Sequence, residues 1–151
     1  MKHFVIATLL LVSALTAGAQ THIYRGSSSY TGDILYTWDG RYLYSGRSTH
    51  SSDIILTFDG KRVYRGKSTY SSDILYTWEG NKVYKGQSSY SGDILYNYDG
   101  RHIYSGRSSY SSDILYTLVG KYLYSGRSTY SSNILYTIEA PIPVPILICI
   151  L

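Results

Sequence analysis

Cysteine, phenylalanine and tryptophan are scarce in this chain of 151 residues. The one cysteine, Cys149, excludes an intrachain disulfide, so the repetition described below must supply the stability. Two Phe and two Trp are few large apolar residues for a core. The nineteen tyrosines must therefore do much of the packing, each as an apolar ring whose hydroxyl needs a partner or water.

Blocks of like charge and catalytic constellations are also missing. The net charge of +4 is mild and the charges are interspersed, which argues against a nucleic-acid partner. His22 and His102 stand eighty positions apart and His50 replaces a repeated Tyr, so no nucleophile and base pair is evident. We expect a protein that is not an enzyme, with no cofactor and no metal.

The longest apolar run lies at the N-terminus and predicts export. Lys2 and His3 precede the apolar segment 4–15, and Ala17-Gly18-Ala19 fits a cleavage site. We expect residues 1–19 to be a signal peptide, because the run is too short for a membrane span. The mature protein is then periplasmic, on the cell surface or extracellular, and has no transmembrane span.

What is present is a twenty-residue repeat, copied six times from Thr21 to Thr137 without insertion or deletion. A fixed period of this size signals a solenoid, a propeller or a hairpin array. We assign residues 20–139 to a six-repeat β domain and residues 140–151 to a Pro-rich, apolar C-terminal cap.

The repeat reads as two strands. Apolar and polar residues alternate with a period of two, and β-branched and aromatic residues are frequent. Leu35 and Leu43 are regular exceptions that place apolar side chains on the otherwise polar parity. Both faces of the sheet therefore carry apolar surface, which is typical of a sheet whose second face is partly covered.

Asp59-Gly60 and its equivalents predict a hairpin turn between the two strands. A type I′ turn would pair Phe58 with Lys61. A type I turn with a bulge at Gly60 would pair Thr57 with Lys61. The second is preferred, because it sets apolar residues beside apolar residues and opposite charges across from each other.

The predicted fold is all-β: tandem two-stranded repeats that form an elongated β-solenoid or hairpin array. A closed propeller or barrel is the alternative. Copies 2 and 6 are nearly identical around residues 41–49 and 121–129. Such recent copying favours the open array, because an open array tolerates added units more easily than a ring.

The C-terminal segment differs from the repeats. Three prolines alternate with apolar residues before the run Ile146 to Leu151. Terminal repeats have one neighbour only, so we interpret this segment as a capping strand over the open end. A membrane or assembly contact is the alternative.

Asp33 and its equivalents begin the second strand of each repeat, with Asn133 in the last. The simplest role for this carboxylate is a local hydrogen bond to backbone N–H groups, as in Asx turns. A calcium site is the alternative, but one carboxylate per repeat offers few ligands.

One tyrosine recurs at the same position of every repeat, and it is our candidate ligand-binding residue. Aromatic faces beside Asp, Ser and Thr are suited to carbohydrate, and repetition would add avidity. Simple packing of the rings is the alternative. The candidate residues are Tyr44, Tyr64, Tyr84, Tyr104 and Tyr124.

The period, the aromatic hairpin and the recurring Gly resemble the choline-binding or cell-wall-binding repeats, which implies a surface-attachment module. The tandem strand-loop-strand plan is also similar in outline to the curli subunits, without their Gln/Asn signature. The unit from Tyr64 to Gly80 most resembles tandem Tyr/Gly repeats of secreted bacterial proteins, and this resemblance transfers no activity.

Two functions are therefore expected. The first is a module that binds a glycan or a cell-wall polymer. The second is a structural protein that assembles edge to edge, because the open ends of an array present unpaired strands.

Overall fold

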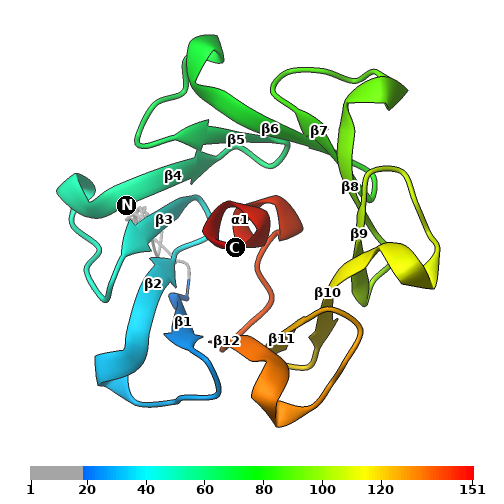
Figure 1. Cartoon of the computed structure of the whole chain (residues 1–151). Coiled ribbons are helices and arrows are strands. Elements are labelled where there is room, and N and C mark those ends of the chain that lie inside the picture. Colours follow the sequence, from blue (N-terminus) through cyan, green and yellow to red (C-terminus); the bar gives the residue numbers. More distant parts are fainter. Residues whose placement is uncertain (1–18) are drawn as a thin grey trace, which may run out of the picture.

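Residues 19–151 are described by a computed structural model, in which twelve strands form one closed, antiparallel ring around a central helix (Figure 1). The predicted signal peptide lies almost wholly outside the described residues. The strands are β1 Thr21–Arg25, β2 Ile34–Trp38, β3 Tyr42–Ser45, β4 Ile54–Phe58, β5 Arg62–Arg65, β6 Ile74–Glu79, β7 Lys82–Lys85, β8 Ile94–Tyr98, β9 His102–Ser105, β10 Ile114–Val119, β11 Tyr122–Ser125 and β12 Ile134–Ile138.

The all-β, tandem-repeat prediction is confirmed, and of the two architectures left open the closed one is found. Each strand pairs with its neighbours in sequence, and β1 pairs with β12, with Ile23 opposite Ile138. The preference for an elongated array was wrong. Near-identical copies indicate how the units arose, whereas closure depends on the small angle that each hairpin adds to the next.

Two kinds of connection alternate around the ring, and because neighbouring strands are antiparallel they lie at opposite edges. The turn edge holds the short turns, such as Asp39–Arg41 between β2 and β3. The loop edge holds six longer connections that contain the 3₁₀ turns η1 to η6. These turns are η1 Thr31–Asp33, η2 Ser51–Asp53, η3 Ser71–Asp73, η4 Ser91–Asp93, η5 Ser111–Asp113 and η6 Ser131–Asn133.

Both predicted hairpin registers were wrong. Phe58 lies opposite Val63, and the N–H of Asp59 donates to the Arg62 carbonyl at 3.2 Å. Gly60 and Lys61 are thus the two central residues of the turn. A type I′ turn centred on Asp59-Gly60 needs positive φ at both residues, but among the described residues only glycines have positive φ, Gly60 with +98°. The Asp59 carboxylate instead caps the turn, accepting from the N–H of Lys61 at 2.9 Å.

The ring is closed by a hairpin that has no turn. In the covalent turn, Asp39 accepts from the N–H of Tyr42 and from the hydroxyl of Tyr44. At the closure, Glu139 accepts from the N–H of His22 at 2.9 Å and from the hydroxyl of Tyr24 at 2.5 Å. The last strand and the first strand therefore form a sixth hairpin, with Glu139 in the place of the turn aspartate.

The C-terminal segment is a helix inside the ring rather than a capping strand. Helix α1, Val144–Ile150, lies at the centre of the ring (Figure 1). It is apolar on all sides, as expected for a helix surrounded by other elements. Pro145 falls in its first turn, where a missing N–H costs nothing. The alternation of proline with apolar residues therefore belongs to a helix start and not to a strand.

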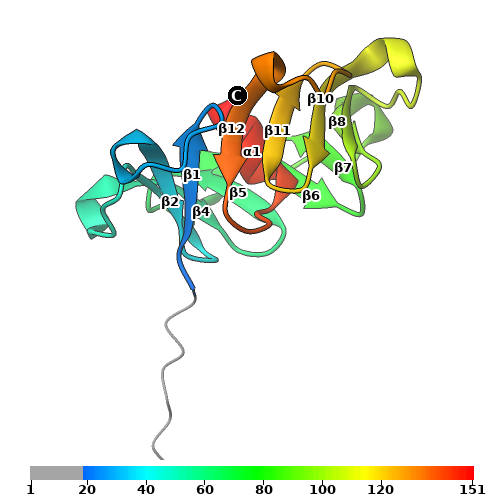
Figure 2. The same cartoon turned by 90° about the horizontal axis from the view of Figure 1, so that it is seen from below.

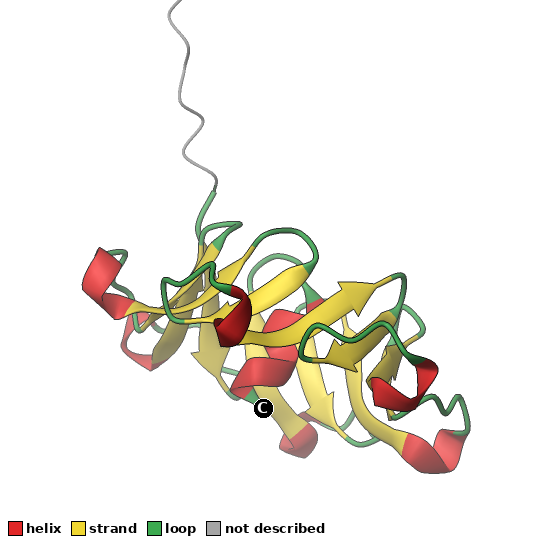
Figure 3. Cartoon of the chain, turned by 90° about the horizontal axis from the view of Figure 1, so that it is seen from above, coloured by secondary structure: helices red, strands yellow, loops and turns green. Residues whose placement is uncertain are grey.

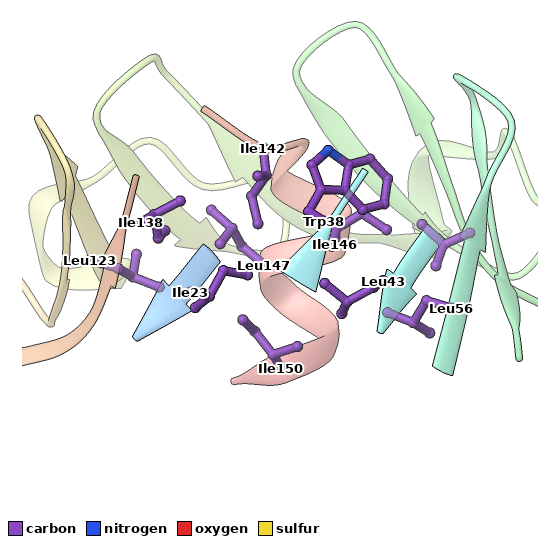
Figure 4. Close-up of a cluster of buried hydrophobic side chains, with 11 residues drawn as sticks. Ile23, Trp38, Leu43, Leu56, Leu123, Ile138, Ile142, Ile146, Leu147 and Ile150 are labelled. Atoms are coloured by element: carbon purple, nitrogen blue, oxygen red, sulfur yellow. The ribbon is translucent and has the colours of Figure 1, made fainter. Parts of the chain in front are cut away.

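The core lies between α1 and the inner face of the strands. Ile146 and Leu147 are fully buried, and they cluster with Ile23, Leu43 and other inward residues (Figure 4). The opposite side of the helix, with Val144 and Ile148, packs in a second cluster. Fully burying one such side chain stabilises the fold by about 1.5–3 kcal/mol, so seven helical residues supply a large part of the core.

The second face of the strands is also partly covered, as the apolar residues on both parities predicted, because Tyr44 on that face is only 6% exposed. The loop-edge segments and their 3₁₀ turns lie at the outer ends of the strands (Figure 3). They are fixed by buried threonines: Thr57 is fully buried, and its hydroxyl donates to the Gly66 carbonyl at 2.7 Å. The same bond joins Thr37 to Gly46, Thr77 to Gly86, Thr117 to Gly126 and Thr137 to Gly26.

Repeat 4 breaks this pattern. Asn97 stands at the threonine position, and its amide donates to the Ser108 carbonyl at 3.2 Å. Its Oδ1 atom is buried without a hydrogen-bond partner. An unpaired buried acceptor destabilises a fold.

Candidate binding surface

The predicted ligand-binding tyrosines do not present free ring faces. Tyr44, Tyr64, Tyr104 and Tyr124 are only 6–7% exposed, and Tyr84 is half-buried. A sugar stacks on an open aromatic face, so the accessible rings that the hypothesis required are absent at this position. The recurrence of tyrosine here follows from packing, which was the alternative.

Three of these tyrosines, Tyr44, Tyr64 and Tyr104, instead donate hydrogen bonds to aspartates of the turn edge. The hydroxyls of Tyr44 and Tyr64 donate to Asp39 and Asp59 at 2.9 Å. Burial, together with the hydrogen bond to Asp39, raises the pKa of Tyr44 to about 12. Burial opposes ionisation of Asp99, but the His102 N–H and the Tyr104 hydroxyl outweigh it and hold the pKa of Asp99 well below its ordinary value.

A different set of aromatic residues is exposed. Each one is the N-cap of a 3₁₀ turn at the loop edge, and these turns lie at the periphery of the ring (Figure 1). Their exposure of 75–78% is far above that of any other tyrosine. We call them the rim tyrosines, and His50 takes their place in repeat 2. They are Tyr30, Tyr70, Tyr90, Tyr110 and Tyr130.

A short hydrogen-bonded loop holds each rim tyrosine in place. In repeat 3 the N–H of Tyr70 donates to Ser68 Oγ at 3.0 Å, and the Ser68 hydroxyl in turn donates to Asp73. The Asp73 N–H donates back to the Tyr70 carbonyl at 3.0 Å. The repeated aspartate thus accepts from a serine hydroxyl rather than from backbone N–H groups, and it fixes the backbone that carries the aromatic ring.

Repeat-to-repeat comparison separates the rim tyrosines from other exposed residues. The exposed position of Arg25 varies between Arg, Lys and Ser, whereas the Tyr30 position is Tyr in five copies and His in one. Packing explains a constant aromatic residue when it is buried. It does not explain one that is about three-quarters exposed, so the constancy here has another cause.

A shallow, open depression that contains one base lies beside the rim tyrosine Tyr130. A hollow of about 600 Å³ is lined by the segment from Ser125 to Tyr130, which includes Arg127. In repeat 4, the Gln87 side chain at the Arg127 position donates to the Ser71 carbonyl at 2.9 Å. This position therefore reaches the preceding loop, next to Tyr70.

The sixfold ring is also what comparison with known protein families finds. Residues 23–147 match the family described as "6-fold beta flower protein". The chain belongs to this beta flower family. Figure 2 shows the flower from the side, with β1 entering at one edge and the C-terminus at the other. Neither a curated protein nor a solved structure matches the chain.

The described part of the flower contains no assembled metal centre: within residues 19–151 no three His, Cys, Asp or Glu residues lie together. Cys149 is largely buried on α1, and burial raises the pKa of its thiol to about 12, so it is not a thiolate at neutral pH. In the same residues, no helix is long and apolar enough to cross a membrane.

Sequence reasoning missed the rim tyrosines because their segment was read only as a polar connection. The signal that identifies them is a constant aromatic residue among Ser, Thr and Gly, with no apolar residue two positions away. Such a ring has no apolar neighbours on a strand face to pack against. The strand tyrosines, by contrast, belong to strands of alternating pattern, so that other apolar side chains lie beside them on the same face.

Proposed function

We propose that this beta flower protein is an exported, non-enzymatic binding module that holds a glycan or a cell-wall polymer on its rim tyrosines. The observation that carries the proposal is their exposure of 75–78%, at one position in five of the six repeats. Tyrosine is enriched at interaction surfaces, because its ring packs on a partner while its hydroxyl stays hydrogen-bonded.

The chemistry of the rim suits a carbohydrate. A tyrosine ring can pack on the CH face of a sugar, while its hydroxyl remains free to form hydrogen bonds. Ser and Thr flank each ring, as in Thr69-Tyr70-Ser71, and add exposed donors and acceptors.

Repetition favours a polymer over a single sugar. Each rim position is a small site, and individual aromatic contacts are weak. Several such sites on one ring raise the effective concentration of the neighbouring units of a chain, so avidity exceeds the affinity of one site. The resemblance to cell-wall-binding repeats and the predicted signal peptide are consistent with a ligand outside the cytoplasm.

The test removes rim rings and measures binding. The triple variant Y70A/Y90A/Y110A is compared with wild type by sedimentation with insoluble cell-wall and plant polysaccharides. We expect at least a tenfold loss of binding with an unchanged circular dichroism spectrum, because these rings make few contacts within the fold. The control Y42A/Y122A removes tyrosines near the turn edge and should bind normally. Equal binding by wild type and the triple variant contradicts the proposal.

Self-assembly is the second candidate function, but it can no longer rest on unpaired strand edges. Edge-to-edge pairing needs unpaired strands, but each strand from β1 to β12 has two neighbours in the ring. Ile146 to Leu151, the other expected contact, belongs to the central helix and the residue after it. The exposed rim tyrosines are then the surface through which copies would contact one another. Analytical ultracentrifugation across protein concentrations distinguishes this from polymer binding, because only self-assembly proceeds without a polysaccharide.

A further inference from the structure

Four of the six loops carry an exposed base three positions before the rim aromatic. These residues, which we call the rim bases, are Arg47, Lys67, Arg107 and Arg127. Among residues 19–151 the only contacts within 4 Å between a basic side chain and a carboxylate are those of His22 with Glu139 and of His102 with Asp99, both at the turn edge. The rim bases therefore have no carboxylate partner in the described part of the chain.

In repeats 3 and 5 the nearest carboxylates in sequence are occupied elsewhere. Asp73 and Asp113 follow the rim tyrosines of repeats 3 and 5, but each accepts a hydrogen bond from a serine hydroxyl of its own loop and is half-buried. They hold the loop backbone. The rim bases consequently remain available to an anion in solvent.

The position of the rim bases lies close to aromatic residues where the contacts are resolved, in repeats 4 and 6. Arg127 and Tyr130 line one hollow of about 600 Å³. Gln87, at the same position in repeat 4, reaches Ser71, the residue that follows Tyr70. A longer Arg or Lys side chain at this position can therefore lie between its own aromatic residue and that of the preceding repeat.

We infer that the rim recognises an acidic polysaccharide, with sugar rings on the rim tyrosines and the regularly spaced anionic groups of the polymer on the rim bases. This inference rests on the proposed function and names its ligand class. Ser27 and Gln87 interrupt the basic series in repeats 1 and 4. Because repeats 1 and 4 lie opposite each other in the ring, the rim presents two separate pairs of bases, from repeats 2 and 3 and from repeats 5 and 6.

The sequence contains a matched control for this inference. The turn edge also has four exposed bases at one repeat position, Arg41, Lys61, Arg101 and Lys121. The variant R47Q/K67Q/R107Q/R127Q and the control R41Q/K61Q/R101Q/K121Q lose the same charge. Only the first changes the surface beside the rim tyrosines.

The probes are polygalacturonate, its fully methyl-esterified form and wall teichoic acid. The first two share one backbone and differ in charge, and the third supplies phosphate instead of carboxylate. We expect wild type to bind at least one anionic polymer, and to bind polygalacturonate more tightly than its ester if carboxylate is the anion. The rim-base variant should lose about ten- to a hundredfold in affinity, and the control less than threefold. Binding by wild type should weaken as salt rises from 20 to 300 mM.

Three results overturn the inference. Equal binding of polygalacturonate and its ester, with teichoic acid unbound, leaves the proposed function intact but removes the anionic ligand. Equal losses in the two charge variants show a nonspecific effect of net charge. Binding to phosphatidylglycerol vesicles but to no polysaccharide shows that a membrane is the partner, and in that case the proposed function also fails.

Discussion

At the scale of single residues, tyrosine has two separate roles within one repeat, as repeat 3 shows. The Tyr64 ring is buried and its hydroxyl completes a turn, whereas the Tyr70 ring is exposed and completes nothing within the fold. The two residues are six positions apart in the same repeat. Identity and recurrence alone could not tell them apart, because both are almost constant among the copies. Their neighbours could, since Tyr64 belongs to an alternating strand and Tyr70 to a run of small polar residues.

Asn97 offers a stabilising substitution. In Asn97→Thr, the hydroxyl would donate to the Gly106 carbonyl, as Thr57 does to Gly66, and the unpaired Oδ1 would be removed. We expect the free energy of unfolding to rise by about 1 kcal/mol in urea denaturation. The reverse change, Thr57→Asn, should lower it. A destabilised Asn97→Thr protein would show that the Oδ1 atom has a partner in solution.

The carboxylates of the turn edge make stability depend on pH. Burial opposes ionisation of Asp59, but the backbone N–H groups of Arg62 and Lys61 outweigh it and lower its pKa. Burial likewise opposes ionisation of Glu139, but hydrogen bonds from the Tyr24 hydroxyl and the His22 N–H outweigh it and lower its pKa. A depressed pKa gives stability that is complete above the unfolded-state value of about 4 and is lost as pH falls through the folded-state value.

We therefore expect the urea midpoint to be level between pH 5 and 7 and to fall between pH 4 and 2. The variant D59N/D99N should be less stable at pH 7 and should lose less on acidification. If the wild type and this variant follow the same pH curve, these two carboxylates are not responsible.

At the scale of elements, α1 determines whether the ring has a core. Leu147 is fully buried, whereas Leu151, just after the helix, is 39% exposed. We expect Leu147→Ala to cost about 2–5 kcal/mol of unfolding free energy, because it leaves a cavity between helix and strands. Leu151→Ala should change stability by less than about 0.5 kcal/mol. Similar small effects in both variants would mean that α1 leaves the ring in solution.

The sequence predicted the strands better than it predicted the helix. Period-two alternation and Asp-Gly turns are local signals, and they located both strands of every repeat. The run Pro143 to Ile150 contains too few residues for a helical period to stand out, and its alternation of prolines with apolar residues suggested a capping strand. Its helical form depends on being surrounded by apolar strand faces, which is a property of the closed ring and not of the segment.

At the scale of the whole molecule, the number of repeats is set by closure. Deleting residues 61–80 joins Gly60 to Asn81 and leaves every remaining turn intact. An elongated array would tolerate this change, but a ring of five hairpins must enclose the same helix. We expect loss of cooperative thermal unfolding or strong destabilisation. As a control, residues 61–80 replaced by a copy of residues 101–120 should fold normally. A stable, cooperative five-repeat monomer would contradict the requirement for six.

Closure of the ring was the part of the fold that could not be decided from the sequence. Each repeat specifies its own hairpin, but the angle between hairpins is the sum of strand twist, bulges such as the one between Leu43 and Tyr44, and packing on α1. Small angles decide between a ring and an open array. The rim tyrosines were missed for a different reason, since their local signal was present but their segment was read only as a polar connection.

The turnless hairpin between β12 and β1 also bears on how the chain folds in time. Tyr44 meets its turn carboxylate 5 residues away, but Tyr24 meets Glu139 across 115 residues. Bringing these ends together costs about 3 kcal/mol more in loop-closure entropy than forming one of the other hairpins. Contacts that are so distant in sequence form slowly. The five covalent hairpins can thus form as the chain emerges, whereas the seam between its two ends must wait for the last strand, and the completed ring follows as the final step.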